Sequence, residues 1–462
     1  MKAVLLIDFG STYTKLTAVD LDAEEIMAVA KSPSTVETDI IQGFNQALAL
    51  LEEQLRKVPH EFTERLACSS AAGGLKMIAI GLVPELTAEA AKRAALGAGA
   101  RILGTYSYQL DRSEMKEINE SRPDIILLAG GTDGGNKDCI IHNAGLLAEM
   151  LPQVPVIVGG NKKARDEIES IFRRKNICFC ISENVMPRLN VIQVEPVRET
   201  IKQMFIERII EAKGIKKVEK IIGNVLMPTP AAVLKAAQVL ADGTDLEEGL
   251  GELVVVDIGG ATTDVHSIAT GEAVQAGVTL RGLQEPYAKR SVEGDLGMRV
   301  SARSLWEAAG SKKIKKYLVA AQFDIEGRCK ELSARVDALP RSPEEEEFDE
   351  AMGAVAAEIA IERHVGVLES QYTPNGIIYS QTGKDLQNIK YLIGTGGVLV
   401  HSKQPGMILR AGLSREENSP YLKPLNPKIL LDKTYIMSAM GLLAERYPDQ
   451  AFRILKRYLE KV

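Results

Sequence analysis

Two short stretches of the chain share a pattern of carboxylate, glycine and hydroxyl residues. The first loop reads DFGSTYTK over residues 8–15, and the second loop reads DIGGATTD over residues 257–264. Each follows a run of apolar residues that is typical of a buried strand. The two loops match in four places: Asp8 with Asp257, Gly10 with Gly259, Ser11 with Gly260, and Thr14 with Thr263. The chain therefore contains an internal repeat at long spacing.

These residue types suit the binding of a phosphate chain together with a metal ion. Glycine lets the backbone approach oxygen atoms closely, and successive backbone N–H groups in such a turn form a concavity for anions. A carboxylate repels phosphate, so Asp8 and Asp257 make sense as ligands of Mg²⁺, which is usually held by one or two carboxylates together with phosphates and waters. Lys15 is expected to offset phosphate charge, and Asp264 to orient a water molecule or take its proton.

Ordinary β-turns are the alternative explanation, because Asp and Gly are also chosen for turn geometry alone. One such loop would leave the two explanations level, whereas two matched loops in the two halves of one chain favour phosphate binding. No segment fits the G-x-x-x-x-G-K-[ST] pattern, so this is not a P-loop site.

A third glycine-rich stretch, YLIGTGGVL over residues 391–399, follows the second loop in the chain. It places Gly394, Gly396 and Gly397 between an expected strand and an expected helix. Positions without side chains would allow an adenine or a ribose to lie against the backbone there. The same pattern is also typical of a tight strand-to-helix corner, and its place after the two loops is what favours the adenosine hypothesis.

The elements that must position these residues follow an alternating pattern. Short apolar strands ending in glycine-rich turns recur along the chain, with helical stretches between them, which predicts an α/β fold with parallel, covered sheets. One helix is expected to have Thr229 as its N-cap, Pro230 at its first position and Gly243 beyond its end. Another is expected to begin at Asp432 and to stop at Pro448.

One glycine-rich turn, AGGTDGGN over residues 129–136, has no place in this scheme. Its polar residues either contact a ligand or partner, or belong to a plain turn. The charged stretch over residues 290–299 is similarly open between a loop near the site and a simple connection.

Composition sets wider limits. The chain has 462 residues, and a prior of ~150 residues per domain suggests two to four units. A net charge of -6 gives no reason to expect nucleic acid as a partner, and no apolar run reaches the ~18 residues that span a membrane. The N-terminus does not resemble a signal peptide. Five cysteines without metal-ligand spacing predict free thiols in a reducing cytoplasm, with Cys178 and Cys180 buried in packing.

The order of first loop, second loop and glycine-rich nucleoside stretch resembles the ASKHA superfamily of sugar kinases, actin and Hsp70-type chaperones. Longer segments resemble, more specifically, the glutamate mutase accessory protein family, called GlmL or MutL. These segments cover residues 67–102, 127–135, 224–234, 256–267 and 292–299. The resemblance implies an α/β actin-like ATPase fold with a nucleotide cleft between two related lobes. The lobes are expected at residues 1–250, including the extra glycine-rich units, and 251–462, with the C-terminal helices as candidates for packing back on the first lobe.

The resemblance also implies a function. It implies an ATP-binding accessory protein whose partner is an adenosylcobalamin-dependent mutase, either glutamate (methylaspartate) mutase or an aminomutase. By analogy with reactivating factors, Mg²⁺-dependent ATP hydrolysis would release damaged cobalamin. Asp8, Asp257 and Asp264 would form the Mg²⁺ and water network. The loop positions carried over by the resemblance are Gly10, Ser11, Thr12 and Lys15 in the first loop, Gly259, Gly260, Thr262 and Thr263 in the second, and Gly394, Gly396 and Gly397 facing adenosine.

Two other functions remain open from the sequence. A small-molecule kinase of the same fold needs a base beside its acceptor, and Asp264 would serve as that base. A nucleotide-binding scaffold without turnover is the other alternative, although binding alone does not need a third carboxylate. The sequence leaves the identity of the mutase and the oligomeric state open.

Overall fold

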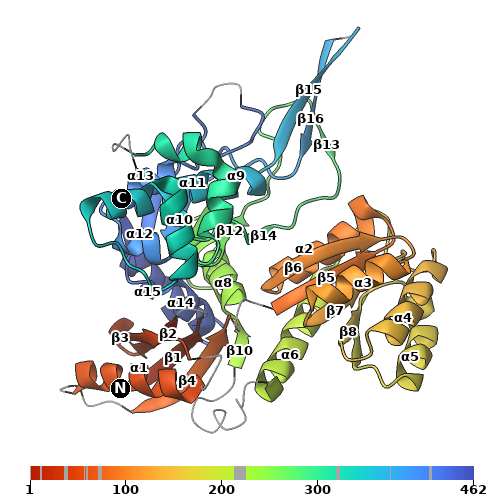
Figure 1. The fold of residues 1–462 in the computed structure, drawn as a ribbon, viewed down its shortest axis with the longest axis horizontal. Helices are drawn as coiled ribbons and strands as arrows, with labels where there is room; N and C mark the ends of the chain where they lie inside the picture. Colours follow the sequence, from red (N-terminus) through yellow and green to blue (C-terminus); the bar gives the residue numbers. More distant parts are fainter. Residues whose placement is uncertain are drawn as a thin grey trace.

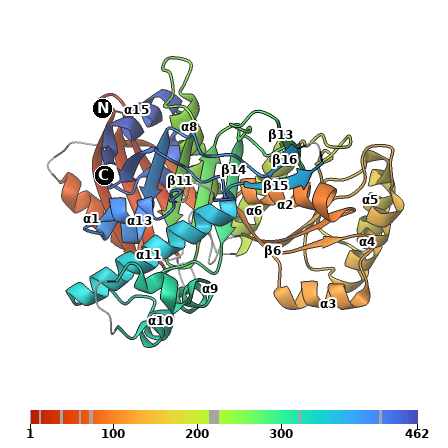
Figure 2. The same cartoon turned by 90° about the horizontal axis from the view of Figure 1, so that it is seen from above.

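The computed structural model describes residues 2–10, 13–35, 40–56, 58, 61–70, 75–212, 225–318, 323–374, 376–415 and 419–462. Within these residues the strands form four sheets. Two lobes lie together on the left of Figure 1, and a third unit lies on the right; Figure 2 shows the same division from above.

The first lobe is built on a five-stranded sheet with the order β10-β4-β1-β2-β3. Its strands are β1 (Ala3–Phe9), β2 (Tyr13–Asp20), β3 (Glu25–Pro33), β4 (Phe62–Ser69) and β10 (Val225–Pro228). β1, β2 and β3 pair antiparallel, whereas β4 runs parallel to β1 and β10 parallel to β4. Helix α1 (Ile40–Leu55) packs on β2 and β3.

The second lobe repeats this sheet. Its order is β14-β12-β11-β17-β18-β19, from β11 (Leu253–Ile258), β12 (Thr263–Ile268), β14 (Ala288–Glu293), β17 (Tyr391–Thr395), β18 (Lys428–Asp432) and β19 (Leu459–Lys461). β12 pairs antiparallel with both β11 and β14, while β17 runs parallel to β11 and β18 parallel to β17. Numbered in chain order within each lobe, the five strands of the first sheet and the first five strands of the second share the spatial order third, second, first, fourth, fifth. The second sheet adds β19 at its edge, so the repeat of the two loops extends to five strands of each sheet.

Helices and a projecting arm complete the second lobe. The helices are α9 (Ala302–Lys315), α10 (Ile325–Ala334), α11 (Pro343–His364), α12 (Gly397–His401) and α13 (Pro405–Arg410). The arm is a separate three-stranded sheet of β13 (Val278–Arg281), β15 (Val367–Thr373) and β16 (Gly376–Thr382). It extends away from the body at the top of Figure 1.

Helices α8 (Thr229–Asp242) and α14 (Met437–Leu443) cross between the lobes, and α15 (Pro448–Tyr458) packs beside them. α8 follows the first sheet and contacts β11 and β12 of the second, while α14 follows the second sheet and contacts β1 and β4 of the first. At the crossing, a Cβ atom added at Gly441 would collide with the Ala232 carbonyl. The helix expected from Asp432 is shorter than predicted, because Asp432 still belongs to β18.

The third unit, residues 75–212, is inserted between β4 and β10 and is called the inserted unit below. Its five strands run parallel in the order β6-β5-β7-β8-β9, a doubly wound arrangement. They are β5 (Leu75–Gly81), β6 (Ala100–Ser107), β7 (Ile125–Leu128), β8 (Val156–Val158) and β9 (Phe179–Ile181). The extra glycine-rich units expected in the first lobe thus form a sheet of their own.

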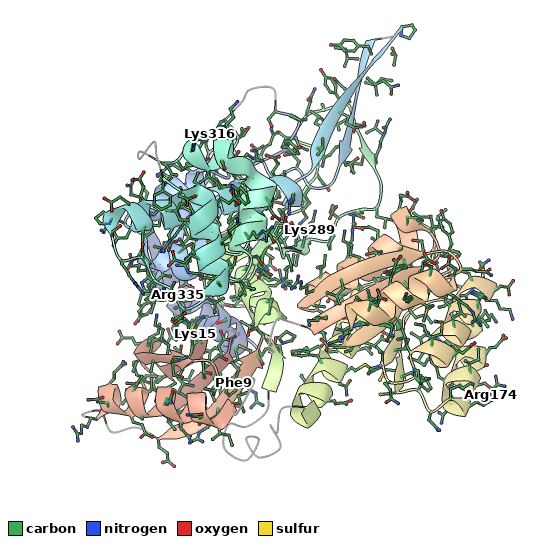
Figure 3. All side chains as sticks on the ribbon, viewed as in Figure 1. Phe9, Lys15, Arg174, Lys289, Lys316 and Arg335 are labelled. Atoms are coloured by element: carbon green, nitrogen blue, oxygen red, sulfur yellow. The ribbon has the colours of Figure 1, made fainter. Side chains whose placement is uncertain are left out.

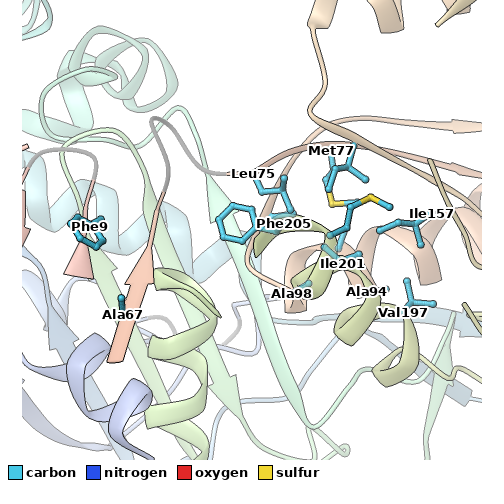
Figure 4. Close-up of a cluster of buried hydrophobic side chains, with 14 of the residues drawn as sticks. Phe9, Ala67, Leu75, Met77, Ala94, Ala98, Ile157, Val197, Ile201 and Phe205 are labelled. Atoms are coloured by element: carbon cyan, nitrogen blue, oxygen red, sulfur yellow. The ribbon is translucent and has the colours of Figure 1, made fainter. Parts of the chain in front are cut away.

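Helices cover the sheet of the inserted unit. They are α2 (Glu89–Gly97), preceded by a π-helical turn (Pro84–Ala88), then α3 (Arg112–Ser121), α4 (Asp138–Met150), a 3₁₀ turn (Lys162–Ala164), α5 (Arg165–Arg174) and α6 (Glu195–Ala212). Figure 4 shows Phe205 and Ile201 of α6 lying against Leu75 and Met77 of β5.

The burial of the cysteines differs from the sequence expectation. Cys178 is exposed and Cys180 half-buried, so the prediction that both are buried was wrong; all five cysteines are free. In the part of the chain that the structure describes, no helix is long and apolar enough to cross a membrane.

Candidate nucleotide-binding site

The alternation of side chains along the central strands turns two aspartates toward the layer between the lobes. In β1, Val4 and Leu6 join the apolar cluster around α8 and α14, and Asp8 follows on the same face. In β11, Leu253 and Val255 join the same cluster, and Asp257 follows them. Both aspartates therefore stand at the carboxyl ends of central strands, facing the junction of the lobes.

The turns after these strands are built alike. The Gly10 N–H donates to the Tyr13 carbonyl oxygen at 3.0 Å, and the Gly259 N–H donates to the Thr262 carbonyl oxygen at 2.9 Å. A Cβ atom added at either glycine would lie within 3 Å of that same oxygen, at 2.6 Å and 2.9 Å respectively, so both turns need glycine. Ser11 and Thr12, predicted to bind phosphate, lie outside the described residues.

Asp8 is buried and joins the two crossing helices. Its Oδ1 accepts a hydrogen bond from Thr229 Oγ1 of α8 at 2.7 Å, and its Oδ2 accepts one from Ser438 Oγ of α14 at 3.0 Å. Thr229 is therefore not the predicted N-cap, a position that Pro228 takes without a side-chain bond. Sequence reasoning missed Thr229 and Ser438 as partners of Asp8.

Lys15 lies opposite Asp8 in the β1–β2 pair. Its Nζ is 3.9 Å from Asp8 Oδ2 and 3.4 Å from the centre of the Tyr435 ring, and Figure 3 shows it where the lobes meet. Burial opposes the charge of the ammonium group, but the facing Tyr435, Asp8 and Asp257 outweigh that effect and raise the pKa of Lys15. The side chain is thus a permanent cation at the junction.

Asp257 has a carboxylate oxygen that the described residues leave unpaired. Its Oδ1 is buried and accepts no hydrogen bond from them. Burial, followed by the charge of Asp264, raises the pKa of Asp257 to about 7. Because an unpaired buried polar atom costs free energy, this oxygen fits a ligand of a cation.

A metal ion here would need ligands beyond the protein. The described residues contain no group of three or more His, Cys, Asp or Glu side chains that could hold an ion by themselves. Mg²⁺ characteristically keeps several waters and binds substrate phosphates together with one or two carboxylates. The donor set of Asp8 and Asp257 fits this mode of binding.

Asp264 lies opposite Asp257 in the β11–β12 pair but is already engaged. Its Oδ1 accepts from Nε and Nη2 of Arg290 at 2.8 Å and 2.5 Å, and its Oδ2 accepts from Thr262 Oγ1 at 2.9 Å. The sequence hypothesis gave Asp264 the role of orienting a water molecule or taking its proton. The structure instead places it in a buried ion pair, and Arg290 was missed as its partner.

The matched threonines of the two loops do not share the face of the aspartates. Thr14 is buried on the α1 side, where a Cβ atom added at Gly43 would lie 3.4 Å from its Oγ1. Thr263 Oγ1 donates to the Leu296 carbonyl oxygen at 2.6 Å. Their predicted contacts with phosphate are therefore corrected to packing roles. Strand alternation relative to Lys15 and Asp264 was the signal that would have shown this.

The three glycines that were expected to face adenosine have different surroundings in the structure. Gly394 lies within β17, where an added Cβ would be 2.7 Å from Leu409 Cδ1, so it serves the packing of α13 rather than an adenosine contact. An added Cβ at Gly396 would be 2.9 Å from Asp257 Oδ1, which places this glycine beside the second loop. Gly397 opens α12 and has free space around its Cβ position.

The end of β18 supplies a site residue that sequence reasoning missed. Asp432 is buried and accepts hydrogen bonds from Thr395 Oγ1 at 3.0 Å and from the backbone N–H groups of Ile436 and Met437 at 2.9 Å each. Burial raises the pKa of Asp432. The signal was available: Asp432 ends a strand at the same sheet edge as Asp257.

The two stretches whose roles the sequence left open lie in different parts of the structure. The stretch 290–299 lies against the second loop, because the Met298 and Arg299 N–H groups donate to the Gly259 and Gly260 carbonyls at 3.0 Å and 2.8 Å. The turn 129–136 belongs to the inserted unit, where Asn161 and Asn184 hydrogen-bond its backbone.

A repeated sheet order, two matched Asp-bearing hairpins at the lobe junction and two crossed helices define the class: the chain has the ASKHA, or actin-like ATPase, fold that the sequence predicted. The model of the MutL protein family matches residues 4–459, and the chain belongs to that family. A curated relative, "Protein MutL" of Clostridium tetanomorphum, is 62% identical over 462 residues and is covered completely, as is this chain. The resemblance to the glutamate mutase accessory proteins is thus confirmed.

Solved structures give more distant likenesses. The nucleotide-free diol dehydratase-reactivating factor is 11% identical with a TM-score of 0.35, over 96% of this chain and 99% of that one. A gluconate kinase from Lactobacillus acidophilus is 9% identical with a TM-score of 0.35, over 100% and 92%. Component A of (R)-2-hydroxyglutaryl-CoA dehydratase from Acidaminococcus fermentans is 11% identical with a TM-score of 0.34, over 98% and 100%. At these scores the likenesses carry no argument about function.

Proposed function

We propose that the chain binds Mg²⁺-ATP between the two lobes. The observation that carries this proposal is the buried, unpaired Oδ1 of Asp257, on a central strand that faces the junction where Lys15 and Asp8 also lie. Asp8 and Asp257 hold the ion, Lys15 offsets phosphate charge, and the turns at Gly10 and Gly259 receive phosphate oxygens. Bound Mg²⁺ supplies charge neutralisation of the phosphates.

We further propose that ATP turnover drives an accessory, chaperone-like role toward an adenosylcobalamin-dependent mutase in the cytoplasm, with glutamate mutase as the first candidate and release of damaged cobalamin as the work done. Membership of the glutamate mutase accessory family supports the choice of partner. The crossing of α8 and α14 supports a hinge, because each helix contacts the sheet of the opposite lobe. Nucleotide held between lobes favours a closed form, and hydrolysis lets the lobes part.

The engagement of Asp264 favours this function over a small-molecule kinase. A kinase base has to accept a proton from the acceptor hydroxyl. Both oxygens of Asp264 are occupied, one by Arg290 and one by Thr262, so the carboxylate is not free for that task.

The test is ATP hydrolysis by the purified protein, alone and with glutamate mutase inactivated by hydroxocobalamin. We expect Mg²⁺-dependent phosphate release and recovery of mutase activity with added adenosylcobalamin. The matched control is Asp257→Asn, which should show neither Mg²⁺-dependent phosphate release nor recovery of mutase activity. Turnover without recovery would retain the ATPase and reject this mutase as partner, whereas absence of nucleotide binding by calorimetry would reject the nucleotide site itself.

A further inference from the structure

One buried guanidinium joins the second loop to the inserted unit. Arg290 of β14 is 5% exposed. Its Nε and Nη2 bind Asp264 Oδ1, while its Nη1 donates to the carbonyl oxygens of Leu96 and Ala100, both at 3.0 Å. Leu96 lies in the last turn of α2, and Ala100 begins β6. A residue of the second lobe thus contacts a nucleotide loop on one side and another structural unit on the other.

The chemistry of these contacts makes them interdependent. The last carbonyls of a helix have no partners within the helix and carry partial negative charge, so α2 presents an acceptor end to Arg290. Arginine offers five N–H donors in a rigid fork and stays charged. Because a buried charge that loses one partner is strongly destabilised, a movement of Asp264 changes how firmly Arg290 holds the end of α2.

Beside the buried Leu283, which packs in the same apolar cluster as the alanines of α2, this interface has polar contacts and incomplete packing. Arg93 of α2 binds Glu285 at 3.0 Å and the Gln284 carbonyl oxygen at 2.8 Å, and Arg198 of α6 reaches the Ala288 carbonyl oxygen at 3.4 Å. Beside these contacts is a cavity of about 420 Å³, lined mainly by charged side chains of α2 and β14. Figure 3 shows Lys289 on the side of the second lobe that faces the inserted unit. Polar interfaces of this kind are typical of units that move relative to one another.

We propose that Arg290 is a positioning residue that couples the second loop to the docking of the inserted unit. Nucleotide bound at the second loop sets the position of Asp264, Arg290 transmits that position to the end of α2, and docking of the inserted unit in turn fixes the position of the second loop. The proposal rests on the proposed nucleotide function. Linkage requires it to act in both directions for binding. Through this coupling, the docking of the inserted unit depends on the nucleotide state, so a partner that contacts this unit would respond to that state.

The test compares Arg290→Gln and Arg290→Lys with Arg93→Gln. Arg93 holds the same interface, but its hydrogen bonds to described residues go to Glu89, Leu283, Gln284 and Glu285 and not to Asp264, so it controls for loosened docking. The first readout is hydrogen exchange across α2, with and without Mg²⁺ and a non-hydrolysable ATP analogue. The second is the kcat and KM for ATP, measured on full-length protein whose folding is verified by its melting temperature.

We expect wild-type α2 to change its exchange rate on binding the analogue. Arg290→Gln should abolish that change and lower kcat about tenfold, which corresponds to about 1.4 kcal/mol of activation free energy. Arg290→Lys should restore part of both. Arg93→Gln should speed exchange in both states while preserving the nucleotide-dependent difference and kcat.

Equal behaviour of Arg290→Gln and Arg93→Gln would overturn the coupling. So would a wild-type protein that hydrolyses ATP without any response in α2, and this result would leave the proposed function intact. If Arg290→Gln does not fold, Arg290→Lys decides, because a lysine retains the charge but loses the rigid fork of donors that joins Asp264 to both carbonyls. A wild-type nucleotide response of α2 in Arg290→Lys would then overturn the coupling. A wild-type protein that binds no nucleotide would instead refute the proposed function.

Discussion

Asp8, Lys15 and Asp257 meet because strand side chains alternate and the ends of central strands face the same junction. This much could be predicted from the sequence, since the matched loops state which residues end the strands. The same alternation, applied strictly, would have removed Thr14 and Thr263 from the phosphate contacts. Arg290 and Ser438 were beyond prediction, because tertiary packing alone brings them to Asp264 and Asp8.

At the residue scale, Asp257→Asn should separate catalysis from stability. We expect ATP turnover to fall roughly 10²-fold or more, because charge stabilisation usually dominates such sites. The melting temperature without nucleotide should rise, because the change removes a buried carboxylate that faces other acids. Phosphate release and thermal unfolding are the measurements, and Asp245→Asn at an exposed position is the control. Wild-type turnover in Asp257→Asn would remove the residue from the metal site.

Lys384 predicts a pH dependence of stability unrelated to the nucleotide. Burial, then the charge of Lys289, lowers the pKa of its ammonium to about 7. In the unfolded chain its pKa returns to about 10.4, so between these values the unfolded state binds more protons and this group makes stability rise with pH. Below about pH 7 Lys384 is charged in both the folded and the unfolded state. Its contribution to the free energy of unfolding is then at its minimum and no longer changes with pH.

Urea unfolding from about pH 6.5 to about pH 9.5 tests this sign. Lys384→Met should remove most of the rise in unfolding free energy over that range, whereas Lys116→Met at an exposed position should keep it. A rise that survives in Lys384→Met would assign it to other groups.

At the element scale, the two crossing helices fix the geometry of the junction. α8 was predictable in extent, because Pro230 and Gly243 mark its ends in the sequence. α14 was not, since β18 takes the residues at which that helix was expected to begin. Which helices cross, and on which residue, depends on long-range packing that no local pattern reveals.

Gly441→Ala should disturb this crossing. The added methyl group would collide with the Ala232 carbonyl, and overpacking of this kind costs about 1–3 kcal/mol of unfolding free energy. ATP turnover should fall as well, because Ser438 on the same helix holds Asp8. Denaturant unfolding measures the cost. Gly145→Ala in α4, with open space around its Cβ position, should instead stabilise by up to about 1 kcal/mol. The same sign for both variants would contradict the crossing as described.

At the scale of the whole molecule, the two matched loops together with the family resemblance predicted two related lobes. The separate sheet of the inserted unit was not predictable, because an apolar strand with a glycine-rich turn looks the same whichever parallel sheet it joins. The turn at residues 129–136 fitted no element of the lobes because it belongs to neither.

Binding between the lobes should stabilise the entire chain. At a hundredfold excess over its Kd, Mg²⁺-ATP should add about 2.7 kcal/mol of unfolding free energy, and the melting temperature should climb with ligand concentration. Differential scanning calorimetry measures this, with ATP in the presence of a chelator as the control. A melting temperature that does not change with Mg²⁺-ATP concentration would contradict binding at the junction of the folded lobes.

The place where the inserted unit connects to the first sheet affects the order of folding. The chain leaves β4 at Ser69 and returns at Val225, whose partner in β4 is Ala67, so a long excursion begins and ends almost at one point. On the ribosome, β10 and α8 emerge only after the whole inserted unit has been synthesised. A unit that folds first brings its two ends together and spares the entropy of closing a long loose loop. The first lobe would then be completed late, because the folded inserted unit positions β10 for pairing with β4.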